Sequence, residues 1–152
     1  MARIRFDISR LGIGELVVGG ANLVLMIGVF LPWFDFGSPA TGDFSFDATA
    51  VRRWMYLPLV ASLVIVVYLA VKATFGEAPL PRLQSLIVLG ACDASLLLTL
   101  VCFAKKGAGV NWDYGAYVSL VAAIAAVVGA IMALSRSRRM TRRRLRTPLR
   151  TG

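Results

Sequence analysis

Four long apolar runs dominate the sequence and limit the folds open to it more than any other feature. Charged residues make up only 16% of the chain and lie in blocks between these runs. A helix needs roughly 20 apolar residues to cross the hydrocarbon core of a bilayer, and each run is about that long. The pattern predicts four transmembrane helices over residues 11–31, 54–73, 83–104 and 116–134.

These spans predict an all-α membrane protein in which four transmembrane helices form an antiparallel bundle. With 152 residues, the chain has room for one such domain, residues 1–134, and for no second folded module. The remainder, residues 135–152, is mostly arginine. We expect it to be a disordered, basic cytoplasmic tail.

Lysine and arginine are divided unequally between the two sides of the predicted bundle. Of the 17 residues, only Arg52, Arg53, Lys105 and Lys106 fall on the side that the first span reaches. Positive charge close to span ends favours the cytoplasmic side of a membrane. Both termini are therefore predicted to be cytoplasmic.

Two acidic residues lie inside the predicted spans, Glu15 and Asp93. Carboxylates within a membrane are costly, so they are usually paired or functional. Glu15 lies about 6 Å past the inner end of the first span, measured by the helical rise per residue. A salt bridge or hydrogen bond is expected there, because the side chains at a similar level are Lys72, Tyr68 and Gln84.

Asp93 lies about 15 Å into the third span, and Asn22 has a similar depth in the first span. Glu15, Gly19 and Asn22 share one helical face, because residues three, four and seven apart lie above one another. We therefore expect Asn22 to face Asp93 across a close helix contact at Gly19. Three roles stay open for Asp93: a hydrogen bond between helices, protonation during transport, and pairing with a partner subunit.

Two of the predicted helices have a face of small or weakly polar residues. Small side chains let helix backbones approach closely within lipid. These faces are expected to pack on each other or on neighbouring helices, or to form a homodimer surface. The third span contributes Ser85, Cys92, Ser95, Thr99 and Cys102, and the fourth contributes Ser119, Ala122, Ala126, Gly129, Ala130 and Ala133.

The first outer loop, residues 35–53, contains three carboxylates, Asp35, Asp43 and Asp47. Carboxylate oxygens can bind a divalent cation, but this spacing matches no defined ion-binding loop. We favour a solvated loop whose phenylalanines reach the membrane interface. A docking surface for an extracytoplasmic partner and a cation site are the alternatives.

Seven arginines follow the last span closely and form a second candidate site. Such clusters are attracted to anionic lipid headgroups. Nucleic acid is not expected as a partner, because the cluster has no interleaved aromatic residues and no folded module. The arginines are Arg136, Arg138, Arg139, Arg142, Arg143, Arg144 and Arg146.

Short motifs at the ends of two spans resemble a known group of proteins. Gly14-Glu15-Leu16 opens the first span, and Val29-Phe30-Leu31-Pro32-Trp33-Phe34 closes it. Together with residues 115–120, they are similar to small four-span membrane proteins of actinobacteria and related high-GC bacteria. The resemblance implies a bacterial inner membrane. That group has no assigned activity, so no catalytic or binding residue follows from it.

The residue types present disfavour an enzyme. Histidine is absent, which removes imidazole general-base catalysis and most zinc sites. No catalytic, cofactor-binding or metal-binding set is predicted. The favoured function is a non-catalytic accessory, assembly or interaction subunit that binds another membrane protein or itself. The alternative is a small oligomeric transporter or channel-like protein that uses Asp93 and Asn22 at the midplane.

Overall fold

Four helices make up most of the computed structural model, which describes residues 11–35, 45–47, 53–75, 81–105 and 111–146. Each helix includes a window that is long and apolar enough to cross a membrane, in agreement with the four predicted spans. A 3-10 turn, η2 (Arg53–Met55), precedes the second of them. The helices are α1 (Ile13–Phe30), α3 (Tyr56–Phe75), α4 (Pro81–Ala104) and α5 (Tyr114–Arg146).

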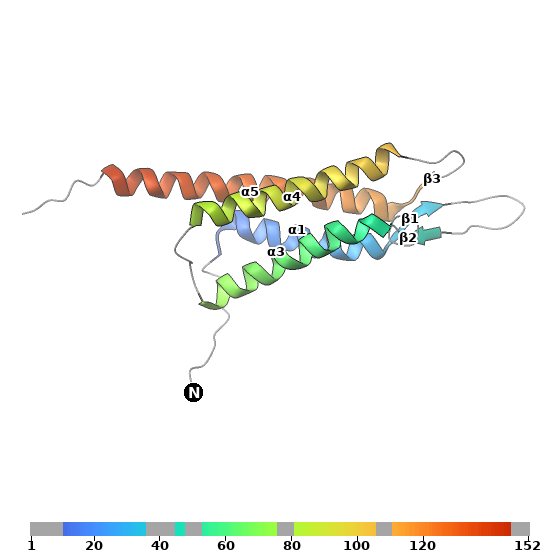
Figure 1. Ribbon diagram of the computed structural model, residues 1–152, viewed down its shortest axis with the longest axis horizontal. Coiled ribbons are helices and arrows are strands. Elements are labelled where there is room, and N and C mark those ends of the chain that lie inside the picture. The colour runs from blue at the N-terminus through green and yellow to red at the C-terminus, as the bar shows by residue number, and fades with distance from the viewer. Residues whose placement is uncertain (1–10, 36–44, 48–52, 76–80, 106–110, 147–152) are drawn as a thin grey trace, which may run out of the picture.

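The helices lie side by side along the long axis of the molecule (Figure 1). α1 packs against α3 and α5, and α4 packs against the same two helices. Apolar side chains fill the space between them, among them Val18, Ile65 and Ala126. Large apolar side chains also cover the outside, as Val64 and Val121 do. An apolar surface of this extent suits a lipid environment rather than water.

The backbones of α1 and α5 approach each other closely. A Cβ atom at Gly14 would lie 2.6 Å from the backbone nitrogen of Ala133 and 2.7 Å from the carbonyl oxygen of Gly129. Further along α1, a Cβ atom at Gly28 would collide with the Ser119 hydroxyl. The small-residue face of α5 therefore packs on α1, which is one of the arrangements that the sequence left open.

The weakly polar face of α4 also points into the protein. Cys92, Ser95, Thr99 and Cys102 are buried, and Ser85 is half-buried. Both small-residue faces are thus used within one chain. Neither is available as the homodimer surface that the sequence also allowed.

A small β-sheet corrects the prediction that the protein is entirely helical. Its strand order is β2-β1-β3, and both pairs are antiparallel. Phe34 in the central strand is paired with Phe46 on one side and with Trp112 on the other. The sheet joins the outer loop to the start of α5. Its strands are β1 (Pro32–Asp35), β2 (Ser45–Asp47) and β3 (Asn111–Trp112).

An aromatic cluster closes the bundle beside this sheet. Trp33 is fully buried, and its indole Nε1 donates a hydrogen bond of 2.8 Å to the carbonyl oxygen of Gly28. The Phe103 ring is stacked on Trp112 with 4.5 Å between centroids and lies 6.2 Å from the Trp33 ring. The aromatic residues at this end therefore form packed core as well as surface.

The last helix is longer than predicted. The apolar span was expected to end at Leu134, but α5 continues to Arg146 and extends beyond the other helices (Figure 1). The prediction of a disordered tail is wrong for residues 135–146, because arginine favours helix and no glycine or proline occurs before Pro148. Residues 147–152 lie outside the described part of the chain.

Candidate functional site

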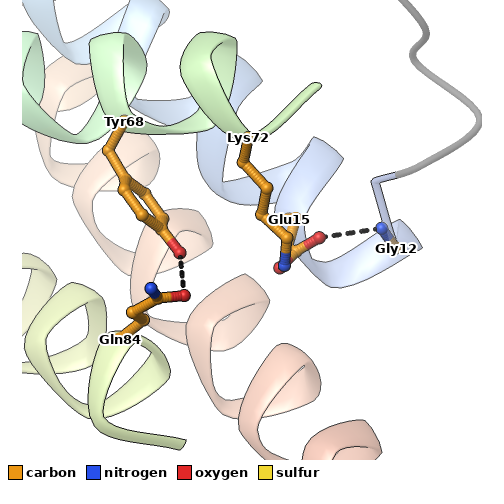
Figure 2. Close-up of polar contacts among 5 residues, drawn as sticks. All are labelled: Gly12, Glu15, Tyr68, Lys72 and Gln84. Carbon is orange, nitrogen blue, oxygen red and sulfur yellow. Dashed lines mark hydrogen bonds and ion pairs between the residues drawn. The ribbon is translucent and has the colours of Figure 1, made fainter. Parts of the chain in front are cut away.

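Five residues at one end of the bundle form what we term the polar cluster: Gly12, Glu15, Tyr68, Lys72 and Gln84 (Figure 2). Glu15 Oε1 lies 2.5 Å from Lys72 Nζ, which joins α1 to α3. Glu15 Oε2 accepts a hydrogen bond of 3.0 Å from the backbone nitrogen of Gly12. The salt bridge predicted for Glu15 is confirmed, and both of its carboxylate oxygens are occupied.

The other half of the polar cluster joins α3 to α4. The Tyr68 hydroxyl donates a hydrogen bond of 2.9 Å to Gln84 Oε1 (Figure 2). Depth along the helices predicted that these side chains lie at a similar level, but it did not predict the pairing of Tyr68 with Gln84. The cluster thus connects three of the four helices through two polar contacts.

The cavity beside the polar cluster is very small. Its volume is about 10 Å³, and its polar wall consists of Glu15, Tyr68 and Ser85. A space of this size holds about one water molecule, which needs two to four polar partners. It can accommodate a structural water but no organic substrate.

Asn22 does not face Asp93, so this prediction is wrong. Asn22 is fully buried, and its Nδ2 donates to the Val18 carbonyl oxygen at 2.8 Å. Across the helix interface, the same atom lies 4.0 Å from the sulfur of Cys92. Gly19 does not provide the expected close contact either, because its neighbour is the Leu69 side chain on α3.

Asp93 lies on the outside of α4 and is exposed. Successive residues of a helix are separated by about 100° around the axis, so burial of Cys92 turns Asp93 outward. Among the residues that the structure describes, none forms a hydrogen bond or ion pair with its carboxylate. This acidic side chain is near the middle of a helix that could span a membrane.

Four side-chain oxygens in the bundle interior have no hydrogen-bond partner in the described part of the chain: Asn22 Oδ1, Ser62 Oγ, Ser95 Oγ and Ser119 Oγ. Buried polar atoms are nearly always paired, so these oxygens mark a weakly polar region between the helices. Sequence reasoning missed Ser62, the one serine or threonine of its apolar run before Thr74. Within the ranges that the structure covers, no basic side chain forms a hydrogen bond with these hydroxyls that could activate one as a nucleophile.

The other predicted candidates are only partly covered by the structure. Asp35 is in β1 and Asp47 in β2, whereas Asp43 lies outside the described residues. Within the described ranges, no three histidine, cysteine, aspartate or glutamate residues gather as a metal site would require. Arg136 is exposed and passes close to Gly12. The side chains of the remaining six arginines are not described.

An apolar groove of about 550 Å³ opens on the outside between α1 and α5. Val17, Ala21 and Val24 form one wall, and Val121 and Ala125 belong to the other.

No protein-family model, curated protein or solved structure matches the chain. The function therefore has to be argued from the side chains and surfaces described above.

Proposed function

We propose that the chain is a non-catalytic integral membrane protein that serves as an accessory, assembly or interaction subunit for another membrane protein. The position of Asp93 carries this proposal. A carboxylate within a membrane normally faces a bundle interior or a partner. Asp93 faces outward from α4, so its partner belongs to another chain.

The interior supports the same conclusion. Glu15 is held by Lys72 and by the backbone of Gly12, and Asn22 donates to its own helix. The cavity beside Glu15 holds about one water molecule. Glu15 and Asn22 are therefore held by neighbouring groups of the protein, which favours a structural role over a reaction centre or a route for solutes.

The proposed setting is a bacterial inner membrane, crossed by an antiparallel bundle with both termini in the cytoplasm. The contacts of Gly14 with Ala133 and of Gly28 with Ser119 support opposite directions for α1 and α5. The unequal division of lysine and arginine supports the cytoplasmic termini. The resemblance of the first span to actinobacterial four-span proteins stays a prediction.

A small oligomeric transporter is the second candidate. Asp93 and Asn22 lie on different faces, so they do not form one pathway within a single chain. An oligomer with α4 around its axis would place Asp93 in a central pore. This arrangement would keep Asp93 as the functional residue without Asn22.

Purification from native membranes distinguishes the two candidates. The tagged full chain would be extracted in mild detergent, and the mass of the intact complex would be determined. An accessory subunit is expected to be recovered in a fixed ratio with one foreign membrane protein. A homo-oligomer without a foreign protein would contradict the proposal, and an ion-flux assay of wild type against Asp93→Asn would then test transport.

A further inference from the structure

The outward face of α4 combines a carboxylate with two small residues. Gly90, Asp93 and Ala94 are all exposed. Gly90 and Ala94 are four residues apart and lie on one stripe, with Asp93 beside them. Apart from its own chain neighbours and helix backbone, no atom of the described residues lies within 4 Å of the position that a Cβ at Gly90 would take. The backbone of α4 is therefore open to close approach at this level.

Large apolar side chains surround this opening on the same helix. The side chains of Ile87 and Leu97 are both 63% exposed, and that of Leu86 is 50% exposed. A second helix can pack against such a face with its backbone close to Gly90 and its side chains between the larger residues. The face thus has the shape of a helix-packing surface, and Asp93 adds a charge to it.

The charge of Asp93 identifies the occupant. A carboxylate removed from water is stabilised by an opposite charge or by hydrogen-bond donors. A second copy of the chain offers no opposite charge at this depth, because the lysine and arginine side chains that the structure describes lie at or beyond the ends of the candidate membrane spans. Lys72 is already paired with Glu15. A symmetric α4–α4 contact would bring two aspartates together, which is unfavourable for like charges.

We infer that the face formed by Gly90, Asp93 and Ala94 binds a transmembrane helix of another protein with a lysine or arginine near its middle. Asp93 forms an ion pair with that basic side chain. Gly90 and Ala94 allow the helix to approach closely enough for the pair to form. The inference rests on the proposed accessory function and specifies its binding surface and the chemistry of its partner.

Förster transfer in vesicles tests this inference with the full chain and defined probes. The chain would carry a donor label on a cysteine added after Gly152, since both native cysteines are buried. The probe is a synthetic leucine-alanine helix of about 21 residues with lysine at its central position. Two further probes have leucine at the centre, or the lysine moved to one end.

The central-lysine probe is expected to associate about tenfold more tightly than the other two probes. Asp93→Asn should remove most of this preference, because the positive charge loses its counter-charge. Gly90→Leu should weaken binding of the central-lysine probe by blocking close approach. Gly20→Leu on α1 is the matched control, because Gly20 is also exposed and a Cβ there would meet no atom of another described element within 4 Å.

Equal binding of all three probes would overturn the inference, and so would an unchanged preference in Asp93→Asn. Transfer between two labelled copies of the chain that Gly90→Leu abolishes would identify a second copy as the occupant and would also overturn it. Thermal unfolding of each variant shows whether the fold is kept.

The same variants separate this inference from the proposed function. If Asp93→Asn and Gly90→Leu leave the native complex with a foreign membrane protein intact, the accessory function stands and the α4 surface is wrong. If no foreign protein is present in native membranes, the accessory function itself fails.

Discussion

At the residue scale, Glu15 makes three favourable interactions. Its carboxylate forms an ion pair with Lys72 and accepts a hydrogen bond from the backbone nitrogen of Gly12. It also places a negative charge in the first turn of α1. A negative charge in the first turn interacts favourably with the helix dipole. One side chain thus fixes the start of α1 and its contact with α3.

Loss of the cation in this pair is expected to destabilise the protein. The Lys72 and Glu15 side chains are only 12% and 18% exposed, so Lys72→Met leaves a largely buried carboxylate without its counter-charge. We expect the free energy of unfolding to fall by about 2 kcal/mol. Sodium dodecyl sulfate titration in mixed micelles, followed by tryptophan fluorescence, measures the change.

The double variant Glu15→Gln, Lys72→Met is the control, because it removes both charges. It should recover part of the lost stability. A double variant no more stable than Lys72→Met would show that the charge of Glu15 is not the cause.

Trp33 is expected to be a second stabilising residue. Trp33→Phe removes the hydrogen bond from Nε1, but the Gly28 carbonyl keeps its bond from the Leu31 backbone nitrogen. The expected loss is therefore only about 1 kcal/mol. Trp33→Ala also leaves a cavity and should cost about 4 kcal/mol. Equal losses in the same denaturant titration would argue against packing as the main contribution.

At the element scale, close packing of α1 on α5 is the most sensitive contact. Gly14→Ala brings a methyl group within 2.6 Å of the Ala133 backbone nitrogen, and a backbone atom cannot move aside cheaply. We expect a loss of about 1–3 kcal/mol. The matched control is Gly20→Ala, where the space is open and the better helix propensity of alanine should give a small gain. Similar effects of both changes on unfolding would contradict this packing.

The helices could be predicted from sequence because a membrane span has a direct physical requirement, a minimum apolar length. The predicted span 83–104 lies within α4, Pro81–Ala104. The sheet could not be predicted in the same way, since β3 has two residues and pairs with a strand far away in sequence. The one local pattern typical of a strand was the alternation of apolar and polar residues in Phe44-Ser45-Phe46.

For the residues of the candidate site, the sequence predicted the depth along the helix axis but not the side of the helix on which each residue lies. Depth placed Lys72, Tyr68 and Gln84 at the level of Glu15, and Lys72 is the one that pairs with it. The bond between Tyr68 and Gln84 was not predicted. For Asp93 the face mattered as well, and depth does not determine it. The buried spacing of Cys92 with Ser95 and Thr99 excludes Asp93 from the same face.

At the scale of the whole molecule, the orientation in the membrane is open to a direct test. With both termini in the cytoplasm, single cysteines introduced at Ser9 or Thr151 should react with an impermeant maleimide only after the cells are opened. A cysteine at Ser38 in the outer loop should react in intact cells. The native Cys92 and Cys102 are buried and should give little background. Labelling of Thr151→Cys in intact cells would reverse the proposed orientation.

The length of α5 has a consequence for the reach of its charge. A helix of 33 residues is about 50 Å long, well beyond the roughly 30 Å hydrocarbon core. Between Arg136 and Arg146 the axis advances about 15 Å, whereas the Debye length at physiological ionic strength is about 8 Å. If α5 continues along the membrane normal, positive charge near Arg136 lies within reach of charge on the membrane surface, whereas positive charge near Arg146 is screened from it.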